Sequence, residues 1–241
     1  MLCGTNMTDI KISNRSAILR LLHEAGAMSR KQIAARLKLT PATITVIINE
    51  LMNESILVEG NSVPNAGAVG RREVMVEISR EKYVALGLAL SQGLVKFTVV
   101  NLHGEIIHEE TFKLPEILTP EYFAETIGRQ IQLKIASYGY SENFIIGIGI
   151  TVCGVVDFAN GIILDSDGIW EEKNVPIVKM FRKQFSFPVI AANNVRSYAN
   201  AYAFLQHDSQ LQNMLFIRNE ATMGVSLILN GQFYGGDRNL A

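Results

Sequence analysis

Apolar residues recur at helical spacing in three short stretches near the start of the chain. The first predicted helix covers about residues 14–25 and stops at Gly26. Ser29 is placed to cap a second helix, and Thr40-Pro41, a hydroxyl N-cap followed by proline, predicts the start of a third. The third helix carries apolar residues at i, i+3, i+4 and i+7, which define one buried stripe: Ile44, Ile47, Ile48 and Leu51.

The opposite face of the third helix carries no charge, although a solvated helix face is normally rich in Lys and Glu. Four residues point away from the stripe: Ala42, Thr45, Val46 and Asn49. Such a face suits the edges of DNA bases, where Asn pairs with adenine and methyl groups meet thymine. We therefore predict DNA contacts for these four residues and for Thr40 at the helix start. Arg30, Lys31 and Gln32 open the second helix and are placed to hold phosphates.

A β-hairpin pattern follows the three helices. Residues 56–59 and 74–78 read as strands, and residues 60–72 between them are rich in Gly, Asn and Pro. This order predicts a winged helix-turn-helix domain over residues 1–80. The loop ends in Arg71 and Arg72, two guanidiniums suited to a minor groove or to phosphates. The alternative is a trihelical unit that mediates only protein contacts.

The pattern changes to strands from Tyr83 onward. We expect two or three strands over residues 83–114, and helices over residues 120–137 and 195–205. Further strands are expected over residues 144–152, 189–192, 214–217 and 225–229. Strands followed by helices and buried strands predict an α/β domain over residues 81–241, and an α+β chain as a whole.

Composition narrows the functional classes only in part. No run of eighteen apolar residues is present, and the start lacks the apolar segment of a signal peptide, so we expect a cytoplasmic protein. Cys3 and Cys153 are too far apart for a clustered metal site, and no metal is predicted. Residues 1–80 contain ten Lys and Arg against seven Asp and Glu. This basic balance suits a polyanionic partner, but chance variation in surface charge explains it equally well.

Five stretches carry a family resemblance from about residue 14 to the end: NRSAILRLLHEAGAMSRKQIAARLKLTPATITVIINELMNESIL, GRREV, VVNLHGEI, GIGITVCGVVDFANGIIL and LILNGQFYGG. In their order and spacing they resemble the ROK family of bacterial sugar kinases and sugar-responsive repressors. The resemblance implies a winged helix-turn-helix before an actin/hexokinase-like (ribonuclease H-like) α/β domain.

The chain departs from the kinases of that family at the positions that carry catalysis. The D-x-G-G-T phosphate loop falls on residues 89–93, where Ala89 replaces the Asp, and the second phosphate loop keeps one glycine and gains Glu220. Asn194 stands where the kinases have the catalytic Asp, and an amide cannot accept the sugar hydroxyl proton. We therefore predict no catalytic residue, no cofactor and no enzymatic activity.

Sugar binding without phosphorylation remains compatible with these changes. Asn193 matches a sugar-contacting Asn of the family, Asn194 can still hydrogen-bond a hydroxyl, and Asp167 precedes the position of another expected Asn, which is Gly168 here. These residues are the candidate effector site. For Asn193 and Asn194 the alternative is that they cap the helix that follows, and Asp167 has the alternative of a solvated turn residue.

In the family, a G-E-x-G-H segment and a zinc motif follow the point at which this sequence stops, after Ala241. We therefore expect an incomplete actin-like domain in which residues 214–229 leave apolar side chains uncovered. The sequence thus predicts a homodimeric regulator, in the first place a repressor, of carbohydrate metabolism. Its expected partners are a double-stranded DNA operator and a small carbohydrate effector. The alternatives are an active ROK sugar kinase and a truncated DNA-binding protein without effector sensing.

Overall fold

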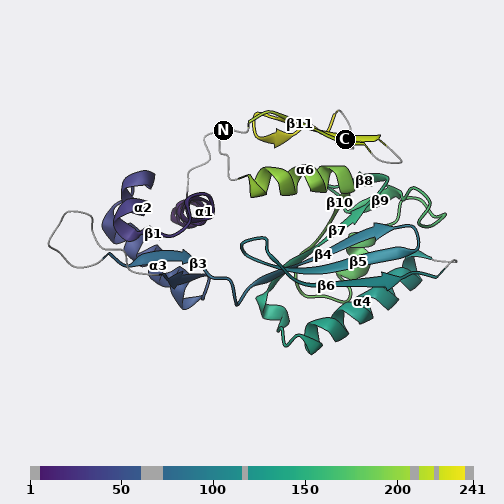
Figure 1. The fold of residues 1–241 in the computed structure, drawn as a ribbon, viewed down its shortest axis with the longest axis horizontal. Coiled ribbons are helices and arrows are strands. Elements are labelled where there is room, and N and C mark those ends of the chain that lie inside the picture. Colours follow the sequence, from purple (N-terminus) through teal and green to yellow (C-terminus); the bar gives the residue numbers. More distant parts are fainter. Residues whose placement is uncertain (1–5, 61–72, 116–118, 207–211, 220–222, 237–241) are drawn as a thin grey trace. The chain divides into compact units, whose positions relative to one another are not determined.

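The computed structural model describes residues 6–60, 73–115, 119–206, 212–219 and 223–236. The chain forms two compact units, Met1–Lys82 and Tyr83–Ala241 (Figure 1). Each unit has its own buried core, and each is described by itself below.

The first unit is a winged helix-turn-helix. Its elements are α1 (Met7–Ala25), β1 (Met28–Ser29), α2 (Arg30–Leu37), α3 (Pro41–Asn53), β2 (Leu57–Glu59) and β3 (Met75–Ile78), and its antiparallel sheet has the order β1-β3-β2. The predicted caps are present, because Ser29 Oγ accepts from Gln32 N at 3.3 Å and Thr40 Oγ1 accepts from Thr43 N at 3.2 Å. The predicted stripe of α3 is buried to 3% exposure or less.

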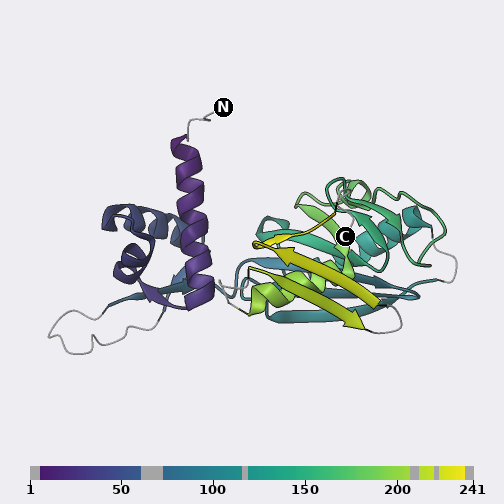
Figure 2. The ribbon, with the colours of Figure 1, turned by 90° about the horizontal axis from the view of Figure 1, so that it is seen from above.

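Helix α1 begins earlier than the hydrophobic pattern predicts, at Met7 rather than near residue 14. Asn6 starts it with a capping box, in which Asn6 Oδ1 accepts from Thr8 N and Asp9 Oδ2 accepts from Asn6 N. Ile10 and Ile12 in this first part are 48% and 58% exposed, so no buried stripe reveals it. Figure 2 shows α1 extending beyond α2 and α3 at its N-terminal end.

The second unit is built on a five-stranded sheet of order β10-β7-β4-β5-β6. Strands β4 (Val84–Ser91), β5 (Leu94–Asn101) and β6 (Ile106–Lys113) form an antiparallel meander. Strands β7 (Ile145–Val152) and β10 (Val189–Asn193) run parallel to β4 and to each other. This mixed sheet is the arrangement of the predicted actin/hexokinase-like α/β fold.

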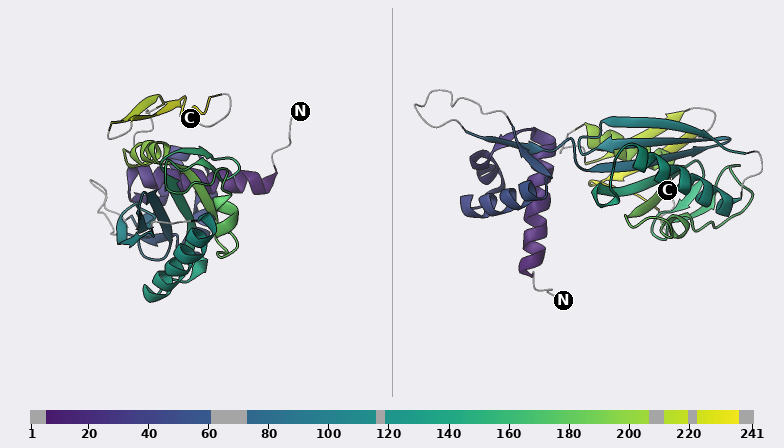
Figure 3. Two further views of the ribbon diagram at one scale, coloured as in Figure 1. Left: turned by 90° about the vertical axis from the view of Figure 1, so that its right-hand side faces the viewer. Right: turned by 90° about the horizontal axis from the view of Figure 1, so that it is seen from below.

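Helices cover both faces of this sheet. Helix α4 (Pro120–Ser137) and the short α5 (Ile177–Phe181) pack on one face, and α6 (Asn194–Leu205) lies on the other (Figure 3). The core between the sheet and α4 contains a chain of aromatic rings, in which Phe123 lies 5.5 Å from Trp170 and 6.0 Å from Phe181 between ring centroids. A short η1 turn (Glu142–Phe144) precedes β7.

The pattern did not predict α5, β1 or the hairpin of β8 (Val155–Asp157) and β9 (Ile162–Asp165). It also did not predict β13 (Gln232–Phe233), which pairs with β12 (Met223–Leu229), itself the partner of β11 (Met214–Asn219). These elements have two to five residues, too few to establish a periodicity.

The β11–β12–β13 sheet packs one face on α6 and leaves the other uncovered within the described residues. The α6 face carries Ile228, which is 5% exposed, and Phe216, whose ring lies 6.4 Å from that of Tyr202 on α6. The outer face carries exposed apolar side chains, as the sequence predicts: Leu215 (59%), Ile217 (55%), Met223 (74%), Val225 (50%) and Leu229 (41%).

Residues 79–83 connect the two units. Ser79 N donates to Ile56 O at 2.8 Å, and Lys82 Nζ donates to Ser55 Oγ at 3.0 Å, so this segment is bound to the first unit as far as Lys82. Tyr83 belongs to the second unit, where its ring meets that of Phe144 edge-on at 5.7 Å.

Candidate nucleic-acid interface and ligand site

The exposed face of α3 is made of the residues that the sequence assigns to base contacts. Ala42, Thr45, Val46 and Asn49 are all exposed, with Val46 at 57%. Thr45 Oγ1 donates to Pro41 O at 2.8 Å, so its hydroxyl is used within the helix. Arg30 on α2 reaches the same face, since its Nη2 donates to Asn49 Oδ1 at 3.4 Å. The structure thus brings Arg30, Thr45 and Asn49 together.

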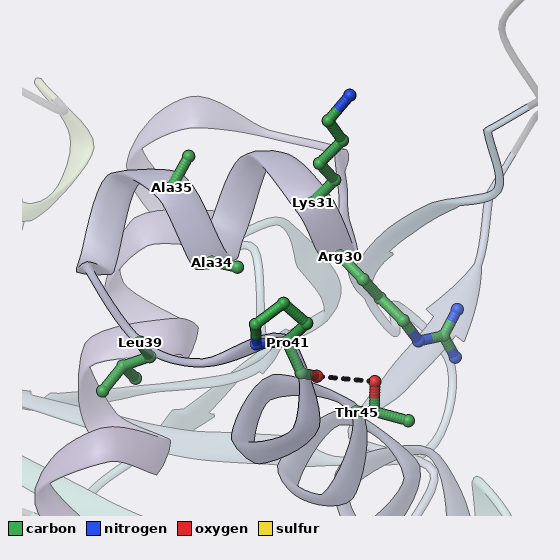
Figure 4. Close-up of a pocket in the computed structure, with 7 residues that line it drawn as sticks. All are labelled: Arg30, Lys31, Ala34, Ala35, Leu39, Pro41 and Thr45. Atoms are coloured by element: carbon green, nitrogen blue, oxygen red, sulfur yellow. Dashed lines mark hydrogen bonds between the residues drawn. The ribbon is translucent and has the colours of Figure 1, made fainter.

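A groove of about 420 Å³ lies between α2 and α3 beside this face (Figure 4). Its floor is mostly apolar and its rim carries two cations, with the lining residues Arg30, Lys31, Ala34, Ala35, Leu39, Pro41 and Thr45. Figure 4 shows both cationic side chains pointing outward from α2. Sequence reasoning named the cations, but it did not identify the apolar residues of the groove, which come from two helices and a turn.

Two of the predicted contacts also have structural roles. Gln32 Oε1 accepts from Ser29 N at 2.8 Å and completes the capping box of α2, while Thr40 caps α3. Both side chains are nevertheless exposed. Arg71 and Arg72 lie outside the described residues, so their predicted DNA contacts stay predictions.

Ion pairs between α1 and α3 neutralise the acidic end of α3. Lys11 Nζ lies 2.7 Å from Glu50 Oε1, and Arg15 pairs with both Glu50 and Glu54. The hydrogen bond from Lys11, assisted by Arg15, lowers the pKa of the Glu50 carboxyl. The hydrogen bonds that Arg15 donates to the Glu54 carboxylate raise the pKa of the Arg15 guanidinium. Two carboxylates that would repel phosphates are therefore paired with cations. The paired residues lie far apart in the sequence, so the local pattern does not predict the ion pairs.

The candidate ligand site lies where β10 ends and α6 begins. Asn193 is the N-cap of α6: its Oδ1 accepts from Val195 N at 2.8 Å, and its Nδ2 donates to Gly154 O at 2.7 Å. This is the capping role that the sequence left open. Asn194 is the first residue of the helix, and its buried Oδ1 has no hydrogen-bond partner among the described residues. A ligand hydroxyl would satisfy that acceptor.

Asp167 lies in the loop after β9, near Cys153, whose Sγ donates to Asp167 Oδ2 at 3.2 Å. Asp167 is exposed and has φ 50°, so the solvated-turn interpretation fits its geometry. The next residue, Gly168, accepts a hydrogen bond from Gln92 Nε2 at 3.4 Å. Gln92 belongs to the β4–β5 turn, where kinases of the resembled family have their first phosphate loop.

Arg196 is a residue of this region that sequence reasoning missed. Its guanidinium carbon lies 4.7 Å from the ring centroid of Phe158 and 5.0 Å from that of Phe233, so the cation stacks between two aromatic rings. Burial lowers the pKa of this guanidinium. No local signal predicts the arrangement, because the rings come from the β8–β9 turn and from β13.

Neither a membrane span nor a metal cluster occurs in the part of the chain that the structure describes. No described helix is both long enough and apolar enough to cross a bilayer. Within the same residues, no group of three or more His, Cys, Asp or Glu side chains is placed to hold a metal ion. Glu220, which the sequence set against phosphate binding, lies outside the described residues.

The first unit therefore defines a winged helix-turn-helix protein, and the second an actin-like α/β domain. Family models agree: residues 13–58 match "Winged helix-turn-helix DNA-binding" and residues 86–241 match "ROK family". The chain belongs to the ROK family.

Curated relatives match nearly the whole chain. The DNA-binding transcriptional dual regulator NagC of Escherichia coli (strain K12) and the N-acetylglucosamine repressor of Escherichia coli O6:H1 are each 26% identical over 231 residues, which are 96% of this chain and 56% of the relative. The xylose repressor of Bacillus subtilis is 22% identical over 231 residues, 96% of this chain and 59% of the relative. The chain thus spans less than three-fifths of the length of these relatives.

Solved structures give the same fold. A ROK family transcriptional regulator, a homologue of the Escherichia coli MLC protein, aligns with a TM-score of 0.76 at 24% identity, over 94% of this chain and 57% of its own. A ROK family glucokinase from Streptomyces griseus, in complex with glucose and AMPPNP, aligns with a TM-score of 0.52 at 19% identity, over 66% of this chain and 48% of its own.

Proposed function

We propose that this chain is a DNA-binding transcriptional regulator of carbohydrate metabolism, acting as a repressor in the cytoplasm. The observation that carries the proposal is the exposed, uncharged face of α3 beside the cation-rimmed groove of α2. Bases are read by short polar and methyl groups on an inserted helix, and phosphates by cations at its edge. The repressors among the relatives, which carry their names for N-acetylglucosamine and xylose, support a sugar-linked role.

DNA binding is tested by fluorescence anisotropy on the promoter region upstream of the chain's own gene. Binding should weaken steeply as the salt concentration rises. The Lys and Arg side chains of the protein release counterions that are condensed on the DNA phosphates, and added salt opposes this release. Arg71→Ala with Arg72→Ala should weaken binding to every duplex, whereas Asn49→Ala should act at particular base pairs. A matched double variant, Lys179→Ala with Lys183→Ala, removes two exposed charges of the second unit and should leave affinity unchanged. Equal affinity for promoter and random duplexes contradicts the proposal.

The second unit, in this proposal, binds a small carbohydrate without phosphorylating it. The buried acceptor of Asn194 supports hydroxyl binding, and Asn193 and Asp167 are the further candidates. An amide in place of a catalytic carboxylate cannot take the hydroxyl proton. A coupled ADP-release assay with a panel of hexoses should show no turnover. ATP turnover that Asn194→Ala abolishes contradicts this part of the proposal.

A homodimer completes the proposal, since one winged-helix unit reads too few base pairs for useful specificity. Sedimentation velocity at increasing protein concentration, with and without the operator duplex, measures the stoichiometry. Two chains on one pseudo-palindromic duplex are expected, and a single bound chain at saturation contradicts the dimer.

A further inference from the structure

The polar groups on the exposed face of α3 are largely used by the protein itself. The Thr45 hydroxyl donates to Pro41 O at 2.8 Å, and Figure 4 shows this hydroxyl turned toward Pro41 and the methyl turned away. The Asn49 Oδ1 accepts from Arg30. What the face presents to a partner is therefore mainly methyl groups, those of Ala42, Thr45 and Val46.

This face is apolar where solvent would favour charge. Val46 is 57% exposed, and Ala42, Thr45 and Asn49, which share its face of α3, are also exposed and carry no charge. Exposed apolar groups gain free energy only when a partner removes them from water. In the DNA major groove, the one methyl group on a base edge is the 5-methyl of thymine, whereas the bases otherwise present mainly hydrogen-bond donors and acceptors there.

We propose that α3 recognises thymine through its 5-methyl group, and that the methyl groups of Thr45 and Val46 determine this specificity. The inference rests on the proposed DNA-binding function and deepens it by naming the chemical group that is read. Asn49, held by Arg30, lies one helical turn from Thr45 and Val46. An Asn at that place suits adenine. Each half-site should therefore contain thymines that face Thr45 and Val46 and an adenine that faces Asn49.

The decisive experiment changes the DNA and not the protein. Duplexes that the chain selects from a random-sequence library are resynthesised with each thymine replaced in turn by deoxyuridine, which removes only the 5-methyl. Affinity is measured by fluorescence anisotropy. At two or more positions in each half-site, the replacement should weaken binding about fourfold, the value of one buried methyl group.

Protein variants assign the contacts to residues. Thr45→Val keeps the methyl and loses the hydroxyl, so it should bind the thymine duplex within twofold of the parent. Thr45→Ser keeps the hydroxyl and loses the methyl, so it should bind about fourfold more weakly and lose its discrimination against deoxyuridine at one position. Val46→Ala should do the same at another position. Ile12→Ala, an equally exposed aliphatic position on α1 at 58%, serves as the matched control and should change nothing.

The outcomes separate this inference from the function on which it rests. If no deoxyuridine replacement changes the affinity, or if Thr45→Ser binds normally while Thr45→Val does not, the methyl inference is wrong and DNA binding stands. If selection enriches no sequence and random duplexes bind equally well, the proposed function itself fails.

Discussion

Replacing Asn193 by Ala should destabilise the second unit without affecting the first. The side chain supplies the N-cap of α6 through Val195 N, and it also bonds the carbonyl of Gly154 at 2.7 Å. Loss of an N-cap costs about 1 kcal/mol. Leaving the half-buried Gly154 carbonyl without its donor costs about 1 kcal/mol more. We therefore expect a loss of about 2 kcal/mol in the free energy of unfolding.

The protein carries its own reporter for this measurement. Trp170 is the one tryptophan of the chain, and it is 7% exposed in the core of the second unit. Its fluorescence during urea unfolding therefore follows that unit alone. Asn193→Asp keeps the capping oxygen but not the donor to the Gly154 carbonyl, so its free energy of unfolding should fall by about half as much as that of Asn193→Ala. Asn200→Ala, at an exposed position of the same helix, is the control and should be neutral or slightly stabilising. A stability of Asn193→Ala within about 0.5 kcal/mol of the parent would refute the reasoning.

Three further predictions concern other parts of the molecule. Ile48→Ala removes a fully buried side chain of α3, so the free energy of unfolding of the first unit should fall by about 3–4 kcal/mol, as measured by circular dichroism of its helices. A loss under about 1 kcal/mol would contradict the packing of this helix. The Glu50 carboxyl has a lowered pKa, so its ion pairs stabilise the protein at pH values above the usual pKa of glutamate, and this stabilisation is lost as the pH falls through the folded pKa. Glu50→Gln should therefore flatten the decline of the urea midpoint with falling pH below about pH 4. Equal slopes of urea midpoint against pH in the parent and the variant would contradict the ion pair. Leu215→Lys with Ile217→Lys should reduce binding of an apolar fluorescent dye and self-association in sedimentation, and unchanged values would show that the outer face of β11 is covered in solution.

Long elements with one buried face could be predicted from the sequence. Helix α4 begins at Pro120 and ends at Ser137 as the pattern indicates, because Thr119 and Pro120 mark its start and a buried stripe follows. The exposed face of α3 was predicted for the same reason, since burial of Ile44, Ile47 and Ile48 fixes which residues face outward.

Features that depend on contacts between distant segments could not be predicted. The Arg196 side chain stacks between rings contributed by two other elements, and the Lys11–Glu50 pair joins positions far apart in the chain. The start of α1 was missed for another reason: its first turns bury no stripe and depend on the capping box of Asn6. The family resemblance pointed to Asn193 and Asn194. It did not reveal that the Asn193 amide is hydrogen-bonded at both ends, whereas the buried Asn194 oxygen has no partner within the part of the chain that the structure describes.

The segment that joins the two units also fixes where the chain can be divided. Lys82 hydrogen-bonds within the first unit, and Tyr83 packs within the second, directly before strand β4. A cut between these two residues keeps each of them with the unit that it contacts, so each unit can be expressed as a separate fragment with its own buried core.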